Sequence, residues 1–538
     1  MTKRYWWIMT IVIVMIALAC TSTPVATPTG GPTTAPTGAP TGAPTDAPMT
    51  DAPTDAPMTD EPTDAPTDGP SEEPTEEPSA EPLGPAVPAV PTGYAELDTA
   101  LTETRTNADG TTSPIYAGTT VSIQTQWIGG EGANFAAAIA DFMTATGIVI
   151  QVDSIGSSHE TVLRTRIEGG QPPDLAMLAQ PTAVLAYGAD GRLVDVATFM
   201  DVDQLTSEHE ATVGLVSTNG NIWGIPYKAD VKSTVWYPIH YFEDNNLAVP
   251  TTWDEFIALM DTIKAAGTFP WCMGMEAGTA TGWQFTDWVE EVMLRTASPE
   301  AYNQWIAGEL PFDSPEVRRA FEMVGQIMFT EGYVLGGSTA IVATPQTEPF
   351  DPAFPPDDNW DGFTPQCVMH KIPTWYGPDF FPDVRAGGAG TETVYGIGED
   401  IGIFYLPPID PEFGTPALGS ADTLMVLAPA AGGEPDPEVK AVAQFLSTPQ
   451  GLQRWIEAGS AISANQSTPQ EWYAGAYKLD VAAQIVNNAT YLGFDASDLM
   501  PPVVGAGTFW TEGVNYINNN GTNLDAVLQA IDASWPAP

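Results

Sequence analysis

The hydrophobic positions near the start of the ordered-looking sequence alternate between strand and helix patterns. Residues 120–127 alternate as a half-buried strand does, and residues 135–146 carry apolar side chains at helical spacing before Gly147. Residues 148–152 are again apolar and β-branched, and a second helical pattern covers about 159–168. Strand, helix and strand at this spacing predict a parallel α/β layer.

The same helical periodicity recurs as far as the C-terminus. Further segments have apolar side chains every three or four residues: 253–265, 286–296, 314–330, 436–458 and 524–533. One of them opens with Thr252, whose side-chain oxygen suits a helix N-cap, and with Asp254 and Glu255 in the first turn, where acids favour the helix dipole. The segment from about residue 93 to the C-terminus is therefore predicted to fold as an α/β protein rich in helices.

The first nineteen residues have the pattern of an export signal. Lys3 and Arg4 precede an apolar run over residues 5–19, which is shorter than the roughly 20 residues of a spanning helix. The run ends Ala17-Leu-Ala-Cys20, which resembles a bacterial lipobox. We predict a lipoprotein signal peptide over 1–19, a lipid on Cys20 and an extracytoplasmic protein anchored to the cell membrane. An ordinary signal peptide with a chance cysteine is the alternative.

Residues 20–92 form a low-complexity repeat of proline, threonine, alanine, glycine and aspartate. With almost no large apolar side chains, this segment buries too little surface to offset the entropy of ordering it. Frequent proline also favours an extended, polyproline-like chain. We predict a disordered tether over 20–92 and a folded domain over 93–538.

Charge and cysteine content narrow the possible partners. The chain carries 17 Lys and Arg against 68 Asp and Glu, a formal net charge of −51. This charge disfavours nucleic acid and anionic lipid headgroups as partners and leaves neutral or cationic small ligands open.

If Cys20 carries lipid, Cys272 and Cys367 remain in an oxidising compartment. This parity predicts a Cys272–Cys367 disulfide, with two buried free thiols as the alternative.

Four motifs in order resemble those of the solute-binding proteins of carbohydrate ABC importers, which have a maltose-binding-protein-like fold. Each is a short turn or helix start: Gly169-Gly-Gln-Pro-Pro-Asp-Leu175, Gly224-Ile-Pro-Tyr227, Val249-Pro-Thr-Thr-Trp-Asp-Glu-Phe256 and Phe445-Leu-Ser-Thr-Pro-Gln-Gly451. Residues 228–237, 270–272 and 282–288 are also similar to segments of α-glucoside-binding lipoproteins, in which two cysteines lie in comparable places.

The resemblance implies a two-lobed, periplasmic-binding-protein-like fold of type II, with discontinuous lobes joined by hinge strands. Lobe I would take about 119–228 and 417–462, and lobe II about 233–410 and 463–536. It also implies a receptor that needs no cofactor. We expect a monomer that captures a mono- or oligosaccharide, above all an α-glucoside, in the cleft between the lobes and delivers it to the permease subunits of an ABC transporter.

A sugar site needs aromatic faces for C–H surfaces and charged or amide groups for hydroxyls. Trp127 and Glu131 follow the first strand, where an α/β sheet presents ligands, and Lys228 and Asp230 lie at the expected hinge. Aromatic residues expected in loops complete the predicted ligand-binding set: Trp283, Trp375 and Trp510.

Two further residues near the hinge are ambiguous. Trp236 is as well suited to a core strand as to a ligand platform. Asp422 follows Gly419-Ser-Ala421, which departs from the Gly-Gly pattern of the relatives, so no role is carried over to Asp422.

Enzyme and metal motifs are missing from the sequence. It has no Gly-x-Ser-x-Gly elbow, Walker A loop or His-Glu-x-x-His, and its four histidines do not have metal-ligand spacing. We therefore predict a receptor without a metal site, and not an enzyme. Since 68 acidic residues leave a catalytic carboxylate pair open, a secreted glycoside hydrolase is one alternative. A surface adhesin or chemosensory receptor that reuses the fold is another.

Overall fold

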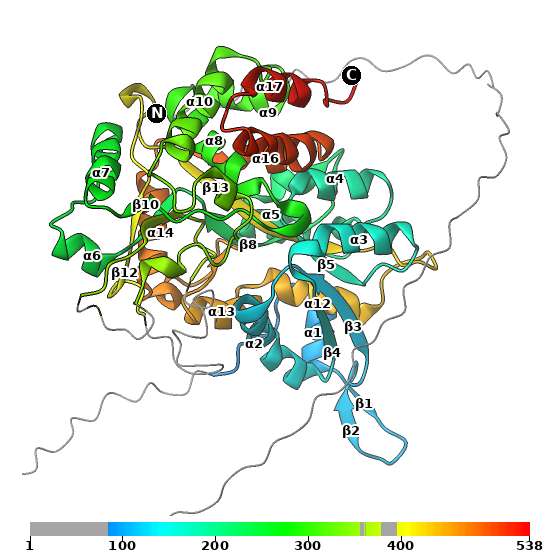
Figure 1. Ribbon diagram of the computed structural model, residues 1–538. Coiled ribbons are helices and arrows are strands. Elements are labelled where there is room, and N and C mark those ends of the chain that lie inside the picture. The colour runs from blue at the N-terminus through cyan, green and yellow to red at the C-terminus, as the bar shows by residue number, and fades with distance from the viewer. Residues whose placement is uncertain (1–83, 356–359, 361, 378–394, 538) are drawn as a thin grey trace, which may run out of the picture. The chain divides into compact units, whose positions relative to one another are not determined.

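Two β-sheets, each packed against its own set of helices, organise the chain downstream of residue 84 (Figure 1). The computed structural model describes residues 84–355, 360, 362–377 and 395–537. The predicted signal peptide, Cys20 and most of the predicted tether lie outside these residues.

The larger sheet has the parallel layer that the sequence predicts. Its strands have the order β14-β8-β13-β5-β3-β4, with β15 also paired to β13. β3 runs parallel to β4 and to β5, whereas β13 runs antiparallel to both β5 and β8. The bounds are β3 Thr120–Thr125, β4 Val149–Ser154, β5 Leu175–Leu178, β8 Ile225–Val231, β13 Ala417–Val426, β14 Ile462–Ser463 and β15 Leu492–Phe494.

The second sheet has four strands in the order β10-β11-β9-β12. Its bounds are β9 Thr234–Pro238, β10 Phe269–Trp271, β11 Cys367–Lys371 and β12 Ile401–Tyr405. Two small hairpins complete the described strands: β1 Thr104–Thr106 with β2 Thr112–Pro114, and β6 Ser217–Thr218 with β7 Asn221–Ile222.

Separate hydrophobic cores divide these elements into two lobes. Lobe I surrounds the larger sheet with α1 Ala95–Thr102, α2 Gly129–Thr146, α3 His159–Glu168, α4 Pro181–Ala189, α5 Val202–Glu208, α12 Pro437–Ser447 and α13 Gln453–Glu457. Lobe II holds α6 Ile239–Asp244, α7 Trp253–Ala265, α8 Trp283–Thr296, α9 Pro299–Ile306, α10 Pro315–Phe329, α11 Ser338–Ile341, α14 Tyr477–Asn488, α15 Ala496–Leu499, the π-helix η10 Val503–Phe509, α16 Trp510–Asn518 and α17 Leu524–Asp532. The predicted two-lobed α/β fold class is confirmed.

The lobes are joined by extended segments that pass from one sheet to the other. β8 of the larger sheet leads through Lys232 and Ser233 alone into β9 of the smaller sheet. β13 pairs with β8 in the register Asp422↔Lys228 and Ser420↔Asp230, so polar side chains of two crossing strands become neighbours. This register places charged groups at the junction between the lobes.

The chain joins lobe I earlier than the predicted boundary at residue 92. Ala86 is fully buried, and its backbone N–H donates to the Asp141 carboxylate at 2.8 Å. The Arg454 guanidinium also donates to Asp141 at 2.8 Å and to the carbonyl of Gly84. Residues 84–92 therefore contact lobe I and do not belong to a free tether, and α1 adds to the lobe I core upstream of residue 119. Repetitive composition hid this boundary, because Ala86 and its neighbours are small and proline-rich.

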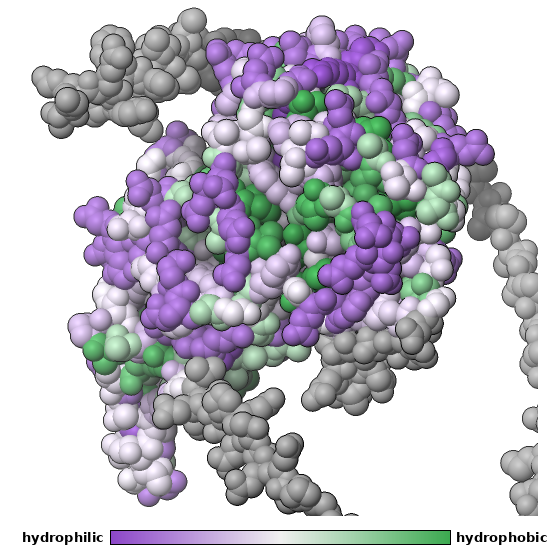
Figure 2. Space-filling view, turned by 90° about the vertical axis from the view of Figure 1, so that its left-hand side faces the viewer, coloured by the Kyte–Doolittle hydropathy of each residue, from purple (hydrophilic) through white to green (hydrophobic). Residues whose placement is uncertain are grey.

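The predicted Cys272–Cys367 disulfide is confirmed. Cys272 follows β10 directly and Cys367 begins β11, and the two strands are parallel neighbours. The bond lies in a second core of lobe II, beside Trp236 and Tyr376. Trp236 is fully buried there, so it is a core residue and not a ligand platform. Over the face drawn in Figure 2, hydrophilic residues border a central area where hydrophobic ones gather.

Candidate functional site

A cavity of about 360 Å³ lies between the lobes. Its wall takes residues from the crossing strand β8, from the segments after β3 and β5 in lobe I, and from α8, α16 and several loops in lobe II. The structure brings all seven sequence-predicted ligand residues to this one wall: Trp127, Glu131, Lys228, Asp230, Trp283, Trp375 and Trp510. Whether they bind ligand stays a prediction, but their convergence is a property of the fold.

On the lobe I side, the cavity has a lysine surrounded by carboxylates. The Lys228 ammonium lies 3.0 Å from Asp230, 3.4 Å from Asp422 and 3.5 Å from Glu131. Burial lowers the pKa of Lys228, but the three carboxylates raise it by more, so the group stays charged. Burial raises the pKa of Glu131 to about 7, against the opposing effect of Lys228. This cluster offers both hydrogen-bond donors and acceptors within one wall.

Asp422 is a cavity residue to which sequence reasoning gave no role. Its carboxylate accepts a 2.8 Å hydrogen bond from the Gln126 amide, and burial raises its pKa. Asp422 lies at the cavity because the antiparallel register with β8 sets it opposite Lys228. Predicting the pairing of the two crossing strands from the sequence would have placed Asp422 beside Lys228.

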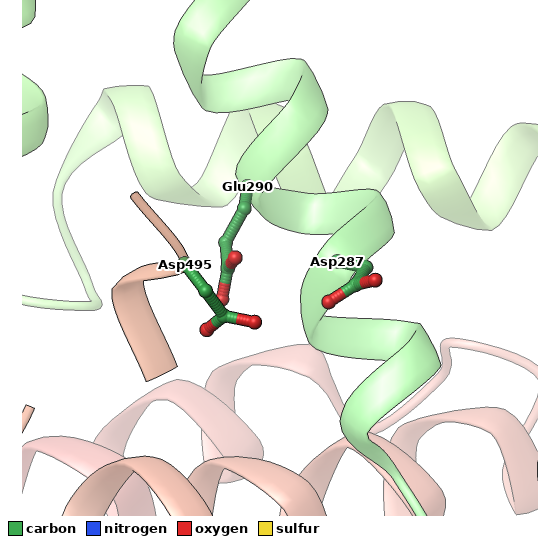
Figure 3. A group of neighbouring side chains, drawn as sticks. All are labelled: Asp287, Glu290 and Asp495. Carbon is green, nitrogen blue, oxygen red and sulfur yellow. The ribbon is translucent and has the colours of Figure 1, made fainter. Parts of the chain in front are cut away.

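On the lobe II side, a second lysine lies among further carboxylates. Lys232 donates to Asp287 at 2.8 Å and also pairs with Asp495. Figure 3 shows Asp287 and Glu290 on one helix, α8, with Asp495 approaching them from another segment. Sequence reasoning missed this cluster. Glu290 and Glu291 are adjacent on a helix and point in different directions, so only Glu290 belongs to the cluster. Glu290 accepts from the Ser497 backbone, while Glu291 pairs with Arg295.

Oxygens of Asp287, Glu290 and Asp495 lie within 4.8 Å of one another, close enough to hold a metal ion. The ammonium of Lys232 already pairs with two of the three, so a resident cation takes the place a metal would need. The set is better explained as a lysine held by carboxylates than as a metal centre.

Burial gives this second cluster an uneven charge distribution. It raises the pKa of Asp287 to about 7 despite Lys232, and burial together with Asp495 raises the pKa of Glu290 and of Asp498. Although burial also acts on Asp495, the charge of Lys232 and several hydrogen bonds lower its pKa. Asp495 and Lys232 therefore form the ionised pair of the cluster.

The aromatic walls of the cavity come mainly from lobe II. Trp283 and Trp375 lie with ring centroids 6.2 Å apart, and the Trp283 indole N–H donates to Gln346 at 2.6 Å. Trp510 donates its N–H to Ser497 at 3.3 Å. Gly282, at φ +119°, allows the Trp510 backbone to approach, since a Cβ there would lie 2.4 Å from the Trp510 carbonyl oxygen.

Two sequence expectations about local structure are wrong. Trp283 and Trp510 begin helices α8 and α16 instead of lying in loops. His370 lies inside β11, where burial lowers its pKa to about 3. Trp127 lines the cavity although it is only 2% exposed, because it packs against Phe135 and Trp455 in the core.

The two lobes touch beside the cavity. Thr279 of lobe II donates to the carbonyl of Ser157 in lobe I at 3.3 Å, and Thr182 of lobe I donates to the carbonyl of Asp498 at 2.9 Å. A Cβ on Gly278 would lie 2.7 Å from the Ser157 carbonyl oxygen, so the approach requires glycine. Contacts of this kind enclose a ligand only when both lobes are in place.

Comparison with known proteins identifies the family of this fold and cavity. Residues 127–358 match the family described as bacterial extracellular solute-binding protein. The osmoprotective compounds-binding protein GgtB of Synechocystis is 32% identical over 417 residues, which cover 77% of this chain and 92% of GgtB. The chain is a bacterial extracellular solute-binding protein. This membership confirms the predicted resemblance, and also the prediction of a binding protein and not an enzyme.

Other relatives of this solute-binding protein extend the comparison. The alpha-glucosides-binding periplasmic protein AglE of Rhizobium meliloti is 32% identical over 429 residues, which cover 78% of this chain and 87% of AglE. Among solved structures, a maltose-bound MalE3 of T. maritima has a TM-score of 0.60 at 15% identity, covering 77% of this chain and 98% of its own. The bacterial solute receptor AcbH has a TM-score of 0.63 at 14% identity, covering 77% of this chain and 97% of its own. These structures share its fold.

Across residues 84–355, 360, 362–377 and 395–537, no helix of this solute-binding protein has the length and apolar character that crossing a membrane requires.

Proposed function

We propose that this solute-binding protein captures a mono- or oligosaccharide, above all an α-glucoside, and delivers it to the permease subunits of an ABC importer. The observation that carries the proposal is an inter-lobe cavity lined by tryptophans and by a lysine–carboxylate cluster from each lobe. AglE, whose name gives alpha-glucosides as its ligands, is 32% identical over most of the chain and supports the sugar class.

The chemistry of the wall suits a sugar. Trp283 and Trp375 offer π faces on which the C–H surface of a pyranose ring can stack. Lys228 and Lys232 supply ammonium donors, and Asp230, Asp422 and Asp495 supply carboxylate acceptors that match vicinal hydroxyl groups. A volume of about 360 Å³ lies at the lower end of the range for small-molecule sites, which favours a compact sugar over a long chain.

Capture would proceed by closure of the lobes. The ligand binds the wall of one lobe and gains contacts from the other only when the Ser157–Thr279 approach forms. A ligand shifts that equilibrium only by its differential affinity for the closed over the open form, so residues from both lobes must contact it. The permease would then recognise the closed arrangement of the two lobes.

The binding proposal is tested by native mass spectrometry of protein purified from its host, followed by calorimetry with a panel of monosaccharides, α-glucosides and β-glucosides. Retention of an intact sugar and tighter binding of α-glucosides are expected. Failure of the whole panel to bind would refute the sugar assignment. Preference for β-glucosides would refute the α-glucoside assignment alone.

Delivery and anchoring are tested separately. Deleting the genes of the permease subunits should abolish uptake of the sugar without affecting its binding to this protein, whereas for an adhesin or chemosensory receptor the deletion would cause no uptake defect. Cys20→Ser should release the protein from the membrane fraction if Cys20 carries the lipid, and a variant that remains bound would refute the anchor. Light scattering should give the mass of a monomer.

A further inference from the structure

A π-helix leads directly into one of the cavity tryptophans. It spans Val503–Phe509 and continues without a break into α16, whose first residue is Trp510. Hydrogen bonds in a π-helix join residues five apart, and such turns are rare and recur at functional sites. Trp510 lines the cavity, whereas the residues of η10, all of them described by the structure, lie outside its lining. The π-helix can therefore act on a ligand only through the residues that it positions.

The π-helix packs against α15 at a point where only glycine fits. Gly505 is buried, and a Cβ built on it would lie far closer to the Ser497 carbonyl oxygen than the 3.0 Å that real Cβ atoms keep. Gly505 does not have a positive φ, so its backbone conformation is open to alanine and the close approach alone requires glycine. An alanine would have to push η10 and α15 apart by more than an ångström, because the obstacle is backbone.

Ser497 connects this contact to the cavity wall. Its backbone N–H donates to Glu290 at 3.0 Å and its hydroxyl donates to Asp495 at 2.8 Å, two acids that Figure 3 shows side by side. The same hydroxyl oxygen accepts a hydrogen bond from the Trp510 indole N–H at 3.3 Å. Ser497 is 2% exposed and lies behind the lining. The position of Ser497 therefore helps to fix the indole of Trp510.

The backbone of Trp510 is held separately, by α8. α16 packs against α8 (Figure 1), and a Cβ on Gly282, directly before α8, would overlap the Trp510 carbonyl oxygen. A Cβ on Gly513, one turn further along α16, would overlap the ring of Phe285 in α8. Because α8 holds the backbone of Trp510 and Ser497 holds its indole, a displacement of Ser497 would move the indole relative to the backbone.

We propose that Gly505 is a positioning residue for ligand binding, which acts on the ligand through Ser497 and the Trp510 indole. The proposal rests on the proposed sugar-binding function and adds to it a residue outside the cavity wall on which the affinity depends. An indole stacks on a sugar only at contact distance and in the right orientation. A gap of an ångström already forfeits a large part of the dispersion attraction between the two surfaces.

The first test is Gly505→Ala, with methyl α-D-glucoside and maltose as the probes in calorimetry. We expect the Kd of the tighter-binding probe to rise about tenfold, which is part of the roughly 5- to 150-fold loss expected when a whole aromatic face is removed. Urea unfolding identifies the conditions in which the variant is folded. A folded Gly505→Ala variant that binds like the parent would overturn the proposal.

Gly507→Ala is the matched control within the same π-helix. Gly507 also lacks a positive φ, and a Cβ on it would meet nothing nearer than the Pro502 carbonyl oxygen at 3.2 Å, an atom of its own turn. Its Kd should therefore stay within about twofold of the parent value. An equal loss of affinity in both variants would assign the effect to alanine in the π-helix and not to the contact with Ser497, and would overturn the proposal.

A double-mutant cycle separates positioning from general damage to lobe II. If Gly505 acts through Trp510, Gly505→Ala should weaken binding in the parent protein and have no further effect in a Trp510→Ala background. Equal losses in both backgrounds would show an effect that bypasses Trp510, against the proposal. Parent-like binding by Trp510→Ala alone would contradict it as well.

Ser497→Ala tests the same link if Gly505→Ala does not fold. It removes the hydroxyl that accepts from Trp510 and adds no atom, so the Kd should rise about fivefold, the value of one hydrogen bond. In a Trp510→Phe background, which lacks the indole N–H, Ser497→Ala should leave the Kd unchanged. A folded Ser497→Ala variant with the parent Kd would overturn the proposal.

The outcomes also distinguish this proposal from the proposed function. If the parent protein binds a probe and its Kd does not depend on Gly505 or Ser497, the positioning role is overturned and the sugar assignment stands. If neither probe binds to the parent protein, the α-glucoside assignment fails, and the positioning of Trp510 for that ligand fails with it.

Discussion

Replacing Trp283 tests the aromatic wall most directly. Trp283 is the first residue of α8, its indole N–H donates to Gln346, and its ring lies 6.2 Å from that of Trp375. Removing one such face should cost about 1–3 kcal/mol of binding, the value of a stacked aromatic platform, so Trp283→Ala should raise the Kd roughly 5- to 150-fold. Trp283→Phe loses the hydrogen bond and part of the aromatic face but keeps a six-membered ring, and should therefore have a smaller effect.

Stability must be measured beside affinity. The ammonium of Lys232 lies 5.1 Å from the centre of the Trp283 ring, so truncation also removes a cation–π contact of about 0.5–2 kcal/mol and a hydrogen bond of about 1 kcal/mol. Urea unfolding gives the stability loss, and calorimetry well below the unfolding midpoint gives the Kd. Trp472→Ala is the control, because Trp472 packs against the core of lobe I. A folded Trp283→Ala variant whose Kd stays within twofold of the parent would refute the aromatic wall.

Three further predictions concern the lobe contact, the disulfide and pH. Gly278→Ala should weaken ligand binding about fivefold by calorimetry, since its Cβ would meet the facing carbonyl of lobe I, whereas Gly220→Ala, also at positive φ but with nothing within 4 Å, should leave the Kd unchanged. Replacing Cys272 and Cys367 together by serine should lower the free energy of unfolding in urea by about 4–5 kcal/mol, and an unchanged midpoint would contradict this. Because burial raises the pKa of Glu131 to about 7, folding takes up a proton there, so its contribution is full below about pH 4 and is lost as the pH rises through 7. Glu131→Gln should flatten that part of the stability–pH profile, and identical profiles would refute the assignment.

The local elements of the fold were largely predictable because they depend on periodicity. Residues 159–168 and 253–265 match α3 and α7 to the residue, since apolar spacing and an N-cap such as Thr252 are local signals. The start of α8 was placed three residues late, because Gly282 and Trp283 are typical of a loop in sequence. Gly282 is there for a close approach to Trp510, a long-range contact that no local pattern shows.

The residue types of the candidate site were easier to predict than its charge. Aromatic and hinge residues could be chosen singly, and they converge on one cavity. The cluster of Lys232, Asp287 and Asp495 could not be assembled from the sequence, because its members come from three segments separated by 55 and 263 residues from the lysine. They come together only because α8 packs against α15, which directly follows Asp495.

The crossing strand limits how this site can diverge. Lys228, Asp230 and Lys232 alternate along one extended segment, so all three reach the cavity. Insertion or deletion of a single residue within that segment would turn the later side chains to the opposite face. New specificity along this wall can therefore arise only by exchange of one side chain for another. Glu276 and Gln346 lie in loops, where side chains do not alternate between two faces as they do in a strand. These loops can therefore also change in length.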